Sequence, residues 1–426
     1  MSLRFAMVTT FYPPFNFGGD GIGIERFCHA LLRRGHHVTV IHDEDAWRNL
    51  ASGREPPPKE HPPGLEVVRL KSRHGLLSSL LTQQLGRPVV HGRRIARLLR
   101  DGRFDVINFH NISLVGGPGV LKHGDALKLH MAHEHWLVCP AHVLWRHNKE
   151  LCTGRECLKC VLAHKRPPQL WRATGYLERE LRHVDAFIAM SEFSRAKHQE
   201  FGFPRDMEVV NYFLPDPPAG QSAPPRPEGA PPHPRPYVLF VGRLEKIKGL
   251  DDVIPLFRER ITDCDLVIAG DGDHAAHLKQ LAAGCERVRF LGRVPLEQLA
   301  GWYRHAQALV VPSVCFETFG IILIEAFQQG TPVLARRLGP FPEIVEKARA
   351  GELFTTADEL VAGLARLRDP VRRAELGANG WRAYVDHWSE AAVVPKYLDV
   401  IRRTALRTGR HELAARLAAD HAGAAR

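Results

Sequence analysis

Residues 315–327 read C-F-E-T-F-G-I-I-L-I-E-A-F, and this stretch decides the fold. The short apolar run at residues 308–312 precedes it and predicts a buried strand. Gly320 allows a tight turn, and Ile321–Gln328 then predicts a buried helix. The stretch is therefore the loop of a strand–loop–helix unit, in which the helix begins after the glycine.

Two glutamates flank the predicted helix start, because Glu317 lies on the loop and Glu325 lies one turn into the helix. In a helix the two positions would be at most about 12 Å apart. The helix N-terminus between them offers N–H groups and a positive dipole end, where an anion binds. We therefore expect one ligand here, whose hydroxyl-bearing ends flank a phosphate group.

The cations that such a ligand needs follow another predicted strand, Tyr237–Val241. Residues 242–249 continue it as G-R-L-E-K-I-K-G and carry Arg243 and Lys248. Arg presents a planar fork to phosphate oxygens, and Lys presents a mobile point charge. Either motif alone is typical of a solvated helix face. The two motifs together, at two strand-to-helix junctions, indicate a phosphate site.

This half of the chain resembles the donor half of a retaining glycosyltransferase with the GT-B fold, of the family-4 type (glycosyl transferases group 1). The resemblance covers about residues 1–402. It implies an α/β fold of two Rossmann-like domains that face each other across a cleft. It also implies transfer of a hexose from a nucleotide-diphosphate sugar to a hydroxyl acceptor, with the anomeric configuration retained. Cell-surface polysaccharide, exopolysaccharide or glycolipid assembly would be the setting.

The resemblance also assigns roles to individual residues. Glu325 is expected to accept hydrogen bonds from the ribose, and Glu317 is expected to act on the donor sugar. The residues expected to be catalytic are His110, Arg243, Lys248 and Glu317. The residues expected to bind the donor are Gly18, Gly19, Arg243, Lys248, Val294, Phe319, Gly320, Ile321 and Glu325.

The N-terminal half opens as a Rossmann-like βαβ unit. Residues 4–10 predict a strand, residues 11–23 a loop and residues 24–34 a helix. The loop lacks the third glycine of the dinucleotide fingerprint. In the family a Gly-Gly pair in this loop meets the donor diphosphate, and Gly18 and Gly19 match that pair.

His110 follows the predicted strand at residues 104–109, at a carboxyl end where open α/β sheets bind ligands. The family often carries two histidines here, whereas this chain has Asn108 and His110. The family resemblance implies that His110 contacts the donor sugar and stabilises positive charge near the anomeric carbon.

Proline content and the strand–helix alternation predict the domain boundaries. We expect an acceptor-binding domain at residues 1–213, a Pro-rich linker at 214–236 and a nucleotide-sugar-binding domain at 237–381. The family implies that a helix at residues 382–403 crosses back to the first domain. An Ala/Arg-rich tail follows at residues 404–426.

Composition places the protein among soluble globular chains, with 44% hydrophobic and 25% charged residues. At 426 residues the chain is long enough for two domains. The N-terminus shows no signal-peptide pattern, so we expect a cytoplasmic protein whose eight cysteines are thiols or metal ligands.

Four of the cysteines, Cys139, Cys152, Cys157 and Cys160, follow one another closely and could hold a structural Zn²⁺. Reduced, partly buried thiols are the alternative.

The net charge of +11 lies mostly in the first 213 residues. It favours an acidic partner, such as anionic lipid or a diphosphate-linked acceptor, although an Arg-rich proteome would give the same excess. A leucine- and arginine-rich amphipathic pattern at residues 76–100 could contact a membrane surface peripherally, but an exposed basic helix face is the alternative. It includes Arg93, Arg94, Arg97 and Arg100.

Two rival functions compete with the GT-B interpretation. A metal-dependent GT-A transferase would use an Asp-x-Asp triplet, which occurs at residues 43–45, 263–265 and 271–273. A basic nucleic-acid-binding protein with a Cys-rich metal module would need basic motifs interleaved with aromatics, and the chain lacks them. We expect instead that Arg243, Lys248 and the helix N-terminus stabilise the leaving diphosphate without a catalytic metal or cofactor. A 2-epimerase or phosphorylase of the same fold is a minor alternative. The sequence leaves the donor base (UDP, GDP or ADP), the sugar and the acceptor open.

Overall fold

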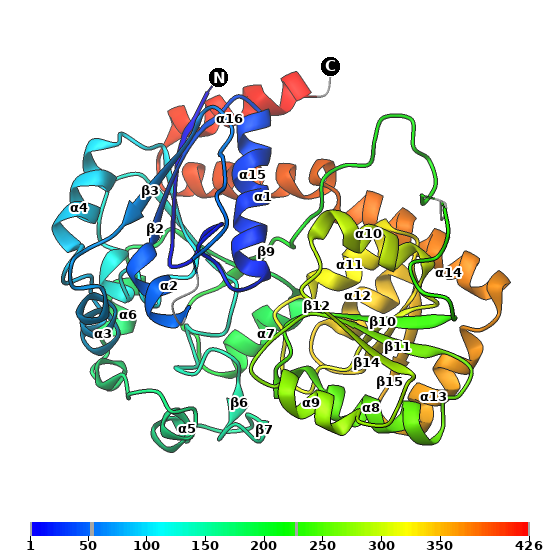
Figure 1. The fold of residues 1–426 in the computed structure, drawn as a ribbon. Helices are drawn as coiled ribbons and strands as arrows, with labels where there is room; N and C mark the ends of the chain where they lie inside the picture. Colours follow the sequence, from blue (N-terminus) through cyan, green and yellow to red (C-terminus); the bar gives the residue numbers. More distant parts are fainter. Residues whose placement is uncertain (1, 52–54, 226–228, 425–426) are drawn as a thin grey trace. The chain divides into compact units, whose positions relative to one another are not determined.

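The computed structural model describes residues 2–51, 55–225 and 229–424, and the chain divides into two compact units (Figure 1). Unit 1 consists of Met1–Tyr212 together with Val393–Arg426, and unit 2 consists of Phe213–Ala392. Residues 226–228 of the expected linker, residue 1, and residues 425–426 of the expected tail lie outside the described residues, as do residues 52–54.

A seven-stranded parallel sheet forms the centre of unit 1, and its order reverses between β1 and β4. From edge to edge the strands are β3 (Leu65–Leu70), β2 (His37–Asp43), β1 (Arg4–Thr9), β4 (Val106–Phe109), β5 (Leu127–Ala132), β8 (Ala186–Ala189) and β9 (Met207–Val209). Strands β4, β5 and β8 are buried along their whole length, as in sheets that helices cover on both faces. A switch point of this kind is where open α/β sheets bind ligands.

The helices of unit 1 connect these strands and cover the sheet. They are α1 (Gly19–Arg33), α2 (Glu44–Leu50), α3 (Gly75–Leu85), α4 (Gly92–Asp101), α5 (Cys157–Ala163), α6 (Tyr176–Leu181), α7 (Glu192–Glu200), α16 (His411–Ala424) and most of α15 (Glu390–Arg407). Two 3₁₀ turns, η1 (Pro118–Val120) and η2 (Leu170–Ala173), and a short hairpin of β6 (Trp145–Arg146) and β7 (Glu150–Leu151) complete the unit.

Unit 2 contains a second parallel sheet, of six strands. Their order is β12 (Val288–Gly292), β11 (Asp265–Ala269), β10 (Tyr237–Val241), β13 (Leu309–Val311), β14 (Val333–Arg336) and β15 (Gly351–Phe354). Its helical segments are η3 (Lys246–Lys248), α8 (Leu250–Glu259), α9 (Ala275–Leu281), α10 (Leu296–His305), α11 (Ile321–Gln328), α12 (Phe341–Ala348), α13 (Ala357–Arg366), α14 (Pro370–Ala383) and the π-helical turn η4 (Tyr384–Trp388). Both sheets alternate with helices, so the α/β prediction is confirmed.

Three helix boundaries differ from the sequence prediction. Helix α1 begins at Gly19 rather than at residue 24, so the two glycines lie at its N-terminus and not in a loop. The amphipathic pattern at residues 76–100 is two helices, because Gly86 ends α3 in the left-handed conformation, with φ of 64°. The helix expected at residues 382–403 is interrupted by η4, and the long helix α15 begins only at Glu390.

Helix α15 packs on unit 1 through a buried polar contact. Tyr397 is fully buried, and its hydroxyl oxygen accepts a hydrogen bond of 3.1 Å from Asn108 Nδ2 on β4. The Tyr397 ring also lies against Phe27 of α1, with centroids 5.3 Å apart. Further along, Arg416 of α16 forms two hydrogen bonds with the Asp105 carboxylate, of 2.6 and 3.2 Å. The C-terminal helices are therefore part of unit 1.

We predict that Tyr397→Phe lowers the free energy of unfolding by about 1–3 kcal/mol, because the buried Asn108 amide loses its oxygen partner. Chemical denaturation of purified variants measures the change. The double variant Asn108→Leu/Tyr397→Phe removes both polar groups and should be more stable than Tyr397→Phe alone. Equal stability of wild type and Tyr397→Phe would show that this contact does not hold α15.

Candidate functional site

The predicted strand–loop–helix unit is present in unit 2. Strand β13 leads into a loop that carries Glu317, and α11 begins at Ile321 after Gly320. Gly320 has a φ of 100°, and a Cβ atom on it would lie 2.7 Å from Cε1 of Phe341. Backbone conformation and packing therefore both require glycine here. The predicted bounds of α11, 321–328, are confirmed.

The Arg243–Lys248 segment lies at the neighbouring strand end. Strands β10 and β13 are adjacent and parallel, so their carboxyl ends meet at the same edge of the sheet. Lys248 ends the short turn η3, and Gly249 follows with a φ of 73°. A Cβ atom on Gly249 would lie 2.1 Å from the carbonyl oxygen of Pro312, which follows β13. The glycine thus lets one junction approach the other.

A salt bridge joins the two junctions. Lys248 Nζ lies 2.5 Å from Glu317 Oε1, and Ser313 Oγ donates a hydrogen bond of 3.2 Å to the same oxygen. The two charged side chains are only 21% and 24% exposed. The structure therefore brings together two of the predicted site residues that are far apart in the sequence.

Both partners of this salt bridge are ionised. Burial is the largest influence, and it opposes the charged form of each group. For Glu317 the Lys248 cation, its hydrogen bond and nearby Arg243 outweigh burial and lower the pKa. For Lys248 the Glu317 carboxylate, with smaller contributions from Cys315 and Glu245, outweighs burial and raises the pKa.

The other donor residues predicted in unit 2 differ in their partners and exposure. Arg243 lies 3.1 Å from Glu245, and its side chain is 55% exposed, so it is accessible to a ligand. Glu325 Oε2 accepts a hydrogen bond of 3.3 Å from the Tyr303 hydroxyl on α10. Phe319 is buried, whereas Val294 and Ile321 are half-buried.

In unit 1, Gly18 and Gly19 lie at the start of α1. Gly18 is the N-cap and has extended backbone, with φ of −145°, and it provides no side chain to cap the helix. A Cβ atom on Gly18 would meet nothing closer than 3.4 Å. Glycine is a common N-cap residue, and neither backbone conformation nor packing requires it here, so the contact of Gly18 with the donor stays a prediction.

His110 directly follows β4 and belongs to a buried row of polar side chains. Its Nδ1 lies 2.8 Å from His133 Nε2, and its Nε2 lies 3.3 Å from the sulfur of Met7. His133 Nδ1 in turn contacts the Tyr212 hydroxyl. Burial lowers the pKa of His110 well below its ordinary value and that of His133 to about 3, so both imidazoles are neutral. His110 can therefore stabilise a nearby positive charge only as a neutral imidazole.

Sequence reasoning missed His133 and Tyr212 as parts of this row. His133 directly follows β5, the neighbour of β4 in the sheet, so the strand-end rule that selected His110 would also have selected it. Tyr212 lies shortly after β9, and nothing in its sequence surroundings marked its buried hydroxyl as part of a site.

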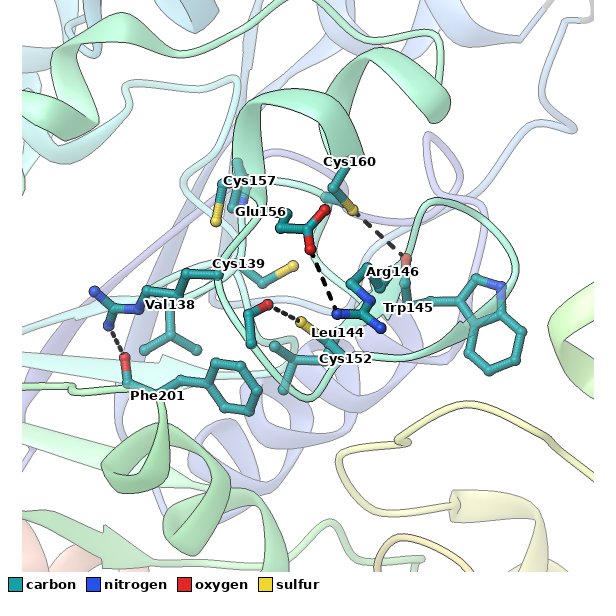
Figure 2. Close-up of a pocket in the computed structure, with 14 residues that line it drawn as sticks. Val138, Cys139, Leu144, Trp145, Arg146, Cys152, Glu156, Cys157, Cys160 and Phe201 are labelled. Atoms are coloured by element: carbon teal, nitrogen blue, oxygen red, sulfur yellow. Dashed lines mark hydrogen bonds and ion pairs between the residues drawn. The ribbon is translucent and has the colours of Figure 1, made fainter.

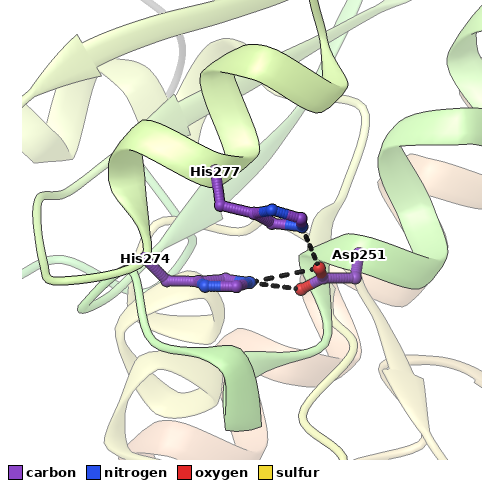
Figure 3. Close-up of side chains that lie close together, drawn as sticks. All are labelled: Asp251, His274 and His277. Carbon is purple, nitrogen blue, oxygen red and sulfur yellow. Dashed lines mark hydrogen bonds and ion pairs between the residues drawn. The ribbon is translucent and has the colours of Figure 1, made fainter.

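Two clusters in the described part of the chain place possible metal ligands within 4.8 Å of one another. In the first, His274 Nε2 and His277 Nε2 lie 2.9 and 2.8 Å from the Asp251 carboxylate, and the two rings stack (Figure 3). This cluster is partly exposed, and it ties α9 to α8.

The second cluster contains Asp43, Asp45 and His91, and it includes one of the Asp-x-Asp triplets. Its oxygens already serve the fold, because Asp43 caps α2 and Asp45 accepts hydrogen bonds from Ser72 and His91. Another triplet is similarly engaged, since Asp263 pairs with Arg368, and Asp265 with His233 and Arg235.

The Lys248–Glu317 salt bridge predicts a pH-dependent stability. The pKa of Glu317 lies below its ordinary value of 4.5, so the contribution is complete above pH 4.5. It is lost as the pH falls through the pKa of the folded state. At about pH 7, Glu317→Gln should lower the free energy of unfolding by about 1–3 kcal/mol, and the difference from wild type should shrink below pH 4.5.

Thermal unfolding of both proteins between pH 3 and pH 7 measures this effect. Glu346→Gln is the control, because Glu346 pairs with Arg337 on the surface and should change stability little. A difference between wild type and Glu317→Gln that stays constant over the whole range would contradict the assignment.

Each half of the chain matches a known protein family. Residues 17–214 match the family described as Glycosyltransferase Family 4, and residues 224–382 match the family described as Glycosyl transferases group 1. A D-inositol 3-phosphate glycosyltransferase from Pseudarthrobacter chlorophenolicus is 35% identical over 37% of this chain and 41% of its own length. A phosphatidyl-myo-inositol mannosyltransferase from Mycobacterium leprae is 35% identical over 36% of this chain and 44% of its own length. The chain thus spans less than half the length of these two relatives.

Solved structures resemble the whole chain. Sucrose-phosphate synthase from Thermosynechococcus elongatus covers 94% of this chain and 98% of its own, with a TM-score of 0.70 and 21% identity. HepE from Anabaena, in complex with UDP and glucose, covers 94% of this chain and 99% of its own, with a TM-score of 0.62 and 16% identity. The two family models together match most of the described residues, and the chain belongs to the family-4 (group 1) glycosyltransferases with the GT-B fold.

Proposed function

We propose that the protein is a retaining glycosyltransferase that moves a hexose from a nucleotide-diphosphate sugar to a hydroxyl of a glycan or lipid-linked acceptor. The observation that carries the proposal is the charged Lys248–Glu317 pair between two adjacent strand ends, next to the N-terminus of α11. Two relatives are named for D-inositol 3-phosphate and phosphatidyl-myo-inositol, and one structural neighbour holds UDP and glucose. These names favour an acceptor in glycolipid or cell-surface polysaccharide assembly.

The donor site would work by charge stabilisation. As the bond between the anomeric carbon and the phosphate oxygen breaks, negative charge grows on the leaving diphosphate. Arg243, Lys248 and the N–H groups at the start of α11 can stabilise that charge without a catalytic metal. The acceptor oxygen forms the new bond on the same face of the sugar, and its proton passes to the departing phosphate.

The salt bridge indicates how the site responds to the donor. Lys248 is the counterion of Glu317 when no phosphate is bound. A bound diphosphate would compete for the Lys248 ammonium, and Glu317 could then accept hydrogen bonds from the sugar hydroxyls instead. Glu325, one turn into α11, would accept hydrogen bonds from the ribose. The roles of Gly18, Gly19 and His110 on the donor stay predictions.

We predict that Glu325→Gln weakens nucleotide-sugar binding by about 1.5–3 kcal/mol, because charge-assisted hydrogen bonds to the ribose are lost. A thermal-shift screen with UDP-, GDP- and ADP-sugars first identifies the donor, since a ligand that binds only the folded state raises the melting temperature. Calorimetric titration then compares wild type, Glu325→Gln and the control Glu297→Gln, which changes an exposed residue of α10. Equal affinities for wild type and Glu325→Gln would refute the ribose contact.

The transfer itself is tested with the same donor. Arg243→Ala should abolish turnover in a protein that melts like wild type, and brief EDTA treatment should leave the initial rate unchanged. If EDTA stops turnover and Mg²⁺ restores it, the metal-independent mechanism is wrong. NMR of the product distinguishes a retained from an inverted anomeric configuration.

We also propose peripheral contact with an anionic membrane, through helix α3 of unit 1. This helix has inverted polarity, because Ser78, Ser79 and Thr82 are buried while Leu76 is 72% exposed and Leu77 and Leu80 are about half exposed. The buried face is polar because it packs on α2, where Asn49 Nδ2 donates to Ser79 Oγ at 2.9 Å. Apolar side chains that face water cost free energy, and a lipid surface would cover them.

Helix α4 supplies the complementary charge. Its apolar residues Ile95 and Leu99 are buried, whereas its arginines, Arg93, Arg94, Arg97 and Arg100, are exposed. Each cation near an anionic surface contributes about 1 kcal/mol. In the described part of the chain, no helix combines the length and apolar character that crossing a bilayer requires.

We predict that Leu76→Ser/Leu77→Ser/Leu80→Ser weakens binding to phosphatidylglycerol-containing vesicles by about tenfold or more, because three apolar side chains no longer enter the lipid surface. Cosedimentation measures the bound fraction. The control Leu296→Ser/Val371→Ser changes exposed apolar residues of unit 2 and should leave binding unchanged. Binding of wild type to neutral phosphatidylcholine vesicles as strongly as to anionic ones would contradict the role of α4.

A further inference from the structure

The segment between β5 and η2 gathers four of the eight cysteines around one small cavity (Figure 2). Cys139 comes from the loop after β5, Cys152 directly follows the β6–β7 hairpin, and Cys157 and Cys160 lie on α5. The cavity that they line has a volume of about 20 Å³. That volume holds one water-sized occupant.

The four cysteines line this cavity together, and all four are free thiols. Thiolates are the ligands that Zn²⁺ prefers, and four of them complete a closed structural site.

One sulfur already accepts a backbone hydrogen bond. The N–H group of His147 donates to Cys160 Sγ at 3.3 Å. A backbone N–H that points at sulfur stabilises the thiolate rather than the thiol. The Cys160 position is thus suited to a metal-bound thiolate.

The backbone of this segment is strained in a way that its few regular elements do not explain. Five of the seven described non-glycine residues with positive φ lie here: His142, Leu144, His147, Asn148 and Lys165. Such conformations are unfavourable for residues with a side chain and persist only where the surroundings enforce them. The hairpin strands have two residues each and α5 has seven, so hydrogen-bonded secondary structure offers little enforcement. A cross-link between the cysteines at the cavity would hold the backbone in these conformations.

We propose that Cys139, Cys152, Cys157 and Cys160 bind one structural Zn²⁺ that holds this segment together. Zn²⁺ would replace the four thiol protons and bind four thiolates at about 2.3 Å. In the structure the thiols are spaced more widely than the ligand atoms of the two compact clusters described above, so binding draws them together. This proposal does not depend on the glycosyltransferase assignment.

The zinc would not take part in the reaction; it would fix the position of the loop that follows His133. The segment begins directly after β5, where His133 contacts His110 and Tyr212. Within it, His142 Nδ1 lies 2.6 Å from the Glu134 carboxylate, next to His133 in sequence. Fixing this segment fixes the loop that follows His133.

Metal analysis of the untagged full-length protein, purified with a reductant and without chelator, tests the proposal. We expect about one zinc per chain. Cys157→Ser and Cys152→Ser should lose the zinc and melt at a lower temperature. Cys285→Ser should keep it, because Cys285 is a buried cysteine of unit 2 whose sulfur lies 3.6 Å from the Phe257 carbonyl, a contact that a serine hydroxyl can also make.

Two measurements on wild type cover the case in which the serine variants do not fold. A mercurial that blocks thiols should release zinc in proportion to the cysteines modified, as read with a chromogenic chelator. Reconstitution with Co²⁺ should give a thiolate-to-cobalt charge-transfer band. Iron in place of zinc, a disulfide among the four cysteines, substoichiometric metal after addition of Zn²⁺, or full zinc content in Cys157→Ser would each overturn the proposal.

Discussion

The salt bridge between Lys248 and Glu317 is the interaction on which the donor half depends. It connects residues 69 positions apart, and it does so because β10 and β13 are adjacent parallel strands with carboxyl ends at one edge. Gly249 and Gly320 make the approach possible, since each has positive φ and a neighbouring atom where a Cβ would stand. The chemistry of the site is therefore set by sheet topology and by two positions without side chains.

The buried ionisable groups are charged in the site of unit 2 and neutral in the histidine row of unit 1. In unit 2 the opposite charges of Lys248 and Glu317 outweigh the effect of burial, so both groups stay charged. In unit 1 burial and neighbouring imidazoles lower the pKa of His110 and His133, and both imidazoles are neutral. Under the proposed function, the Lys248 cation that would meet phosphate is kept ionised by a carboxylate that phosphate can replace. Groups in the buried histidine row work by hydrogen bonding instead.

Local pattern and turn chemistry predicted the elements that carry the donor site. The bounds of β10 and α11 agree with the sequence prediction. Both elements are short and bounded by glycine, so periodicity and breakers suffice there. That Lys248 and Glu317 belong to one site was inferred from charge, because carboxylates beside a phosphate need cations. The direct salt bridge between them was not predicted, because no local signal reports which strands become neighbours.

What the sequence did not predict depends on tertiary packing. Helix α3 was expected to be part of one amphipathic pattern, but its serines face α2 and its leucines face solvent, so the burial is the reverse of what composition predicts. The break before α15 is a π-turn at Tyr384–Trp388, whose residues Tyr384 and Trp388 are fully buried. Helix α15 then begins after Ser389, whose hydroxyl accepts a hydrogen bond of 3.2 Å from Ala392 N and so caps the helix.

The exceptions to ordinary packing rules are concentrated in a few places, and each has a physical deficit that a different ligand would remove. The exposed leucines of α3 lack an apolar cover. The four thiols share one cavity, and the backbone around them has five residues with positive φ and no cross-link. A protein that retains such costs against a stability of only about 5–15 kcal/mol must recover them elsewhere. A lipid surface and a zinc ion are the proposed ligands that match these two deficits.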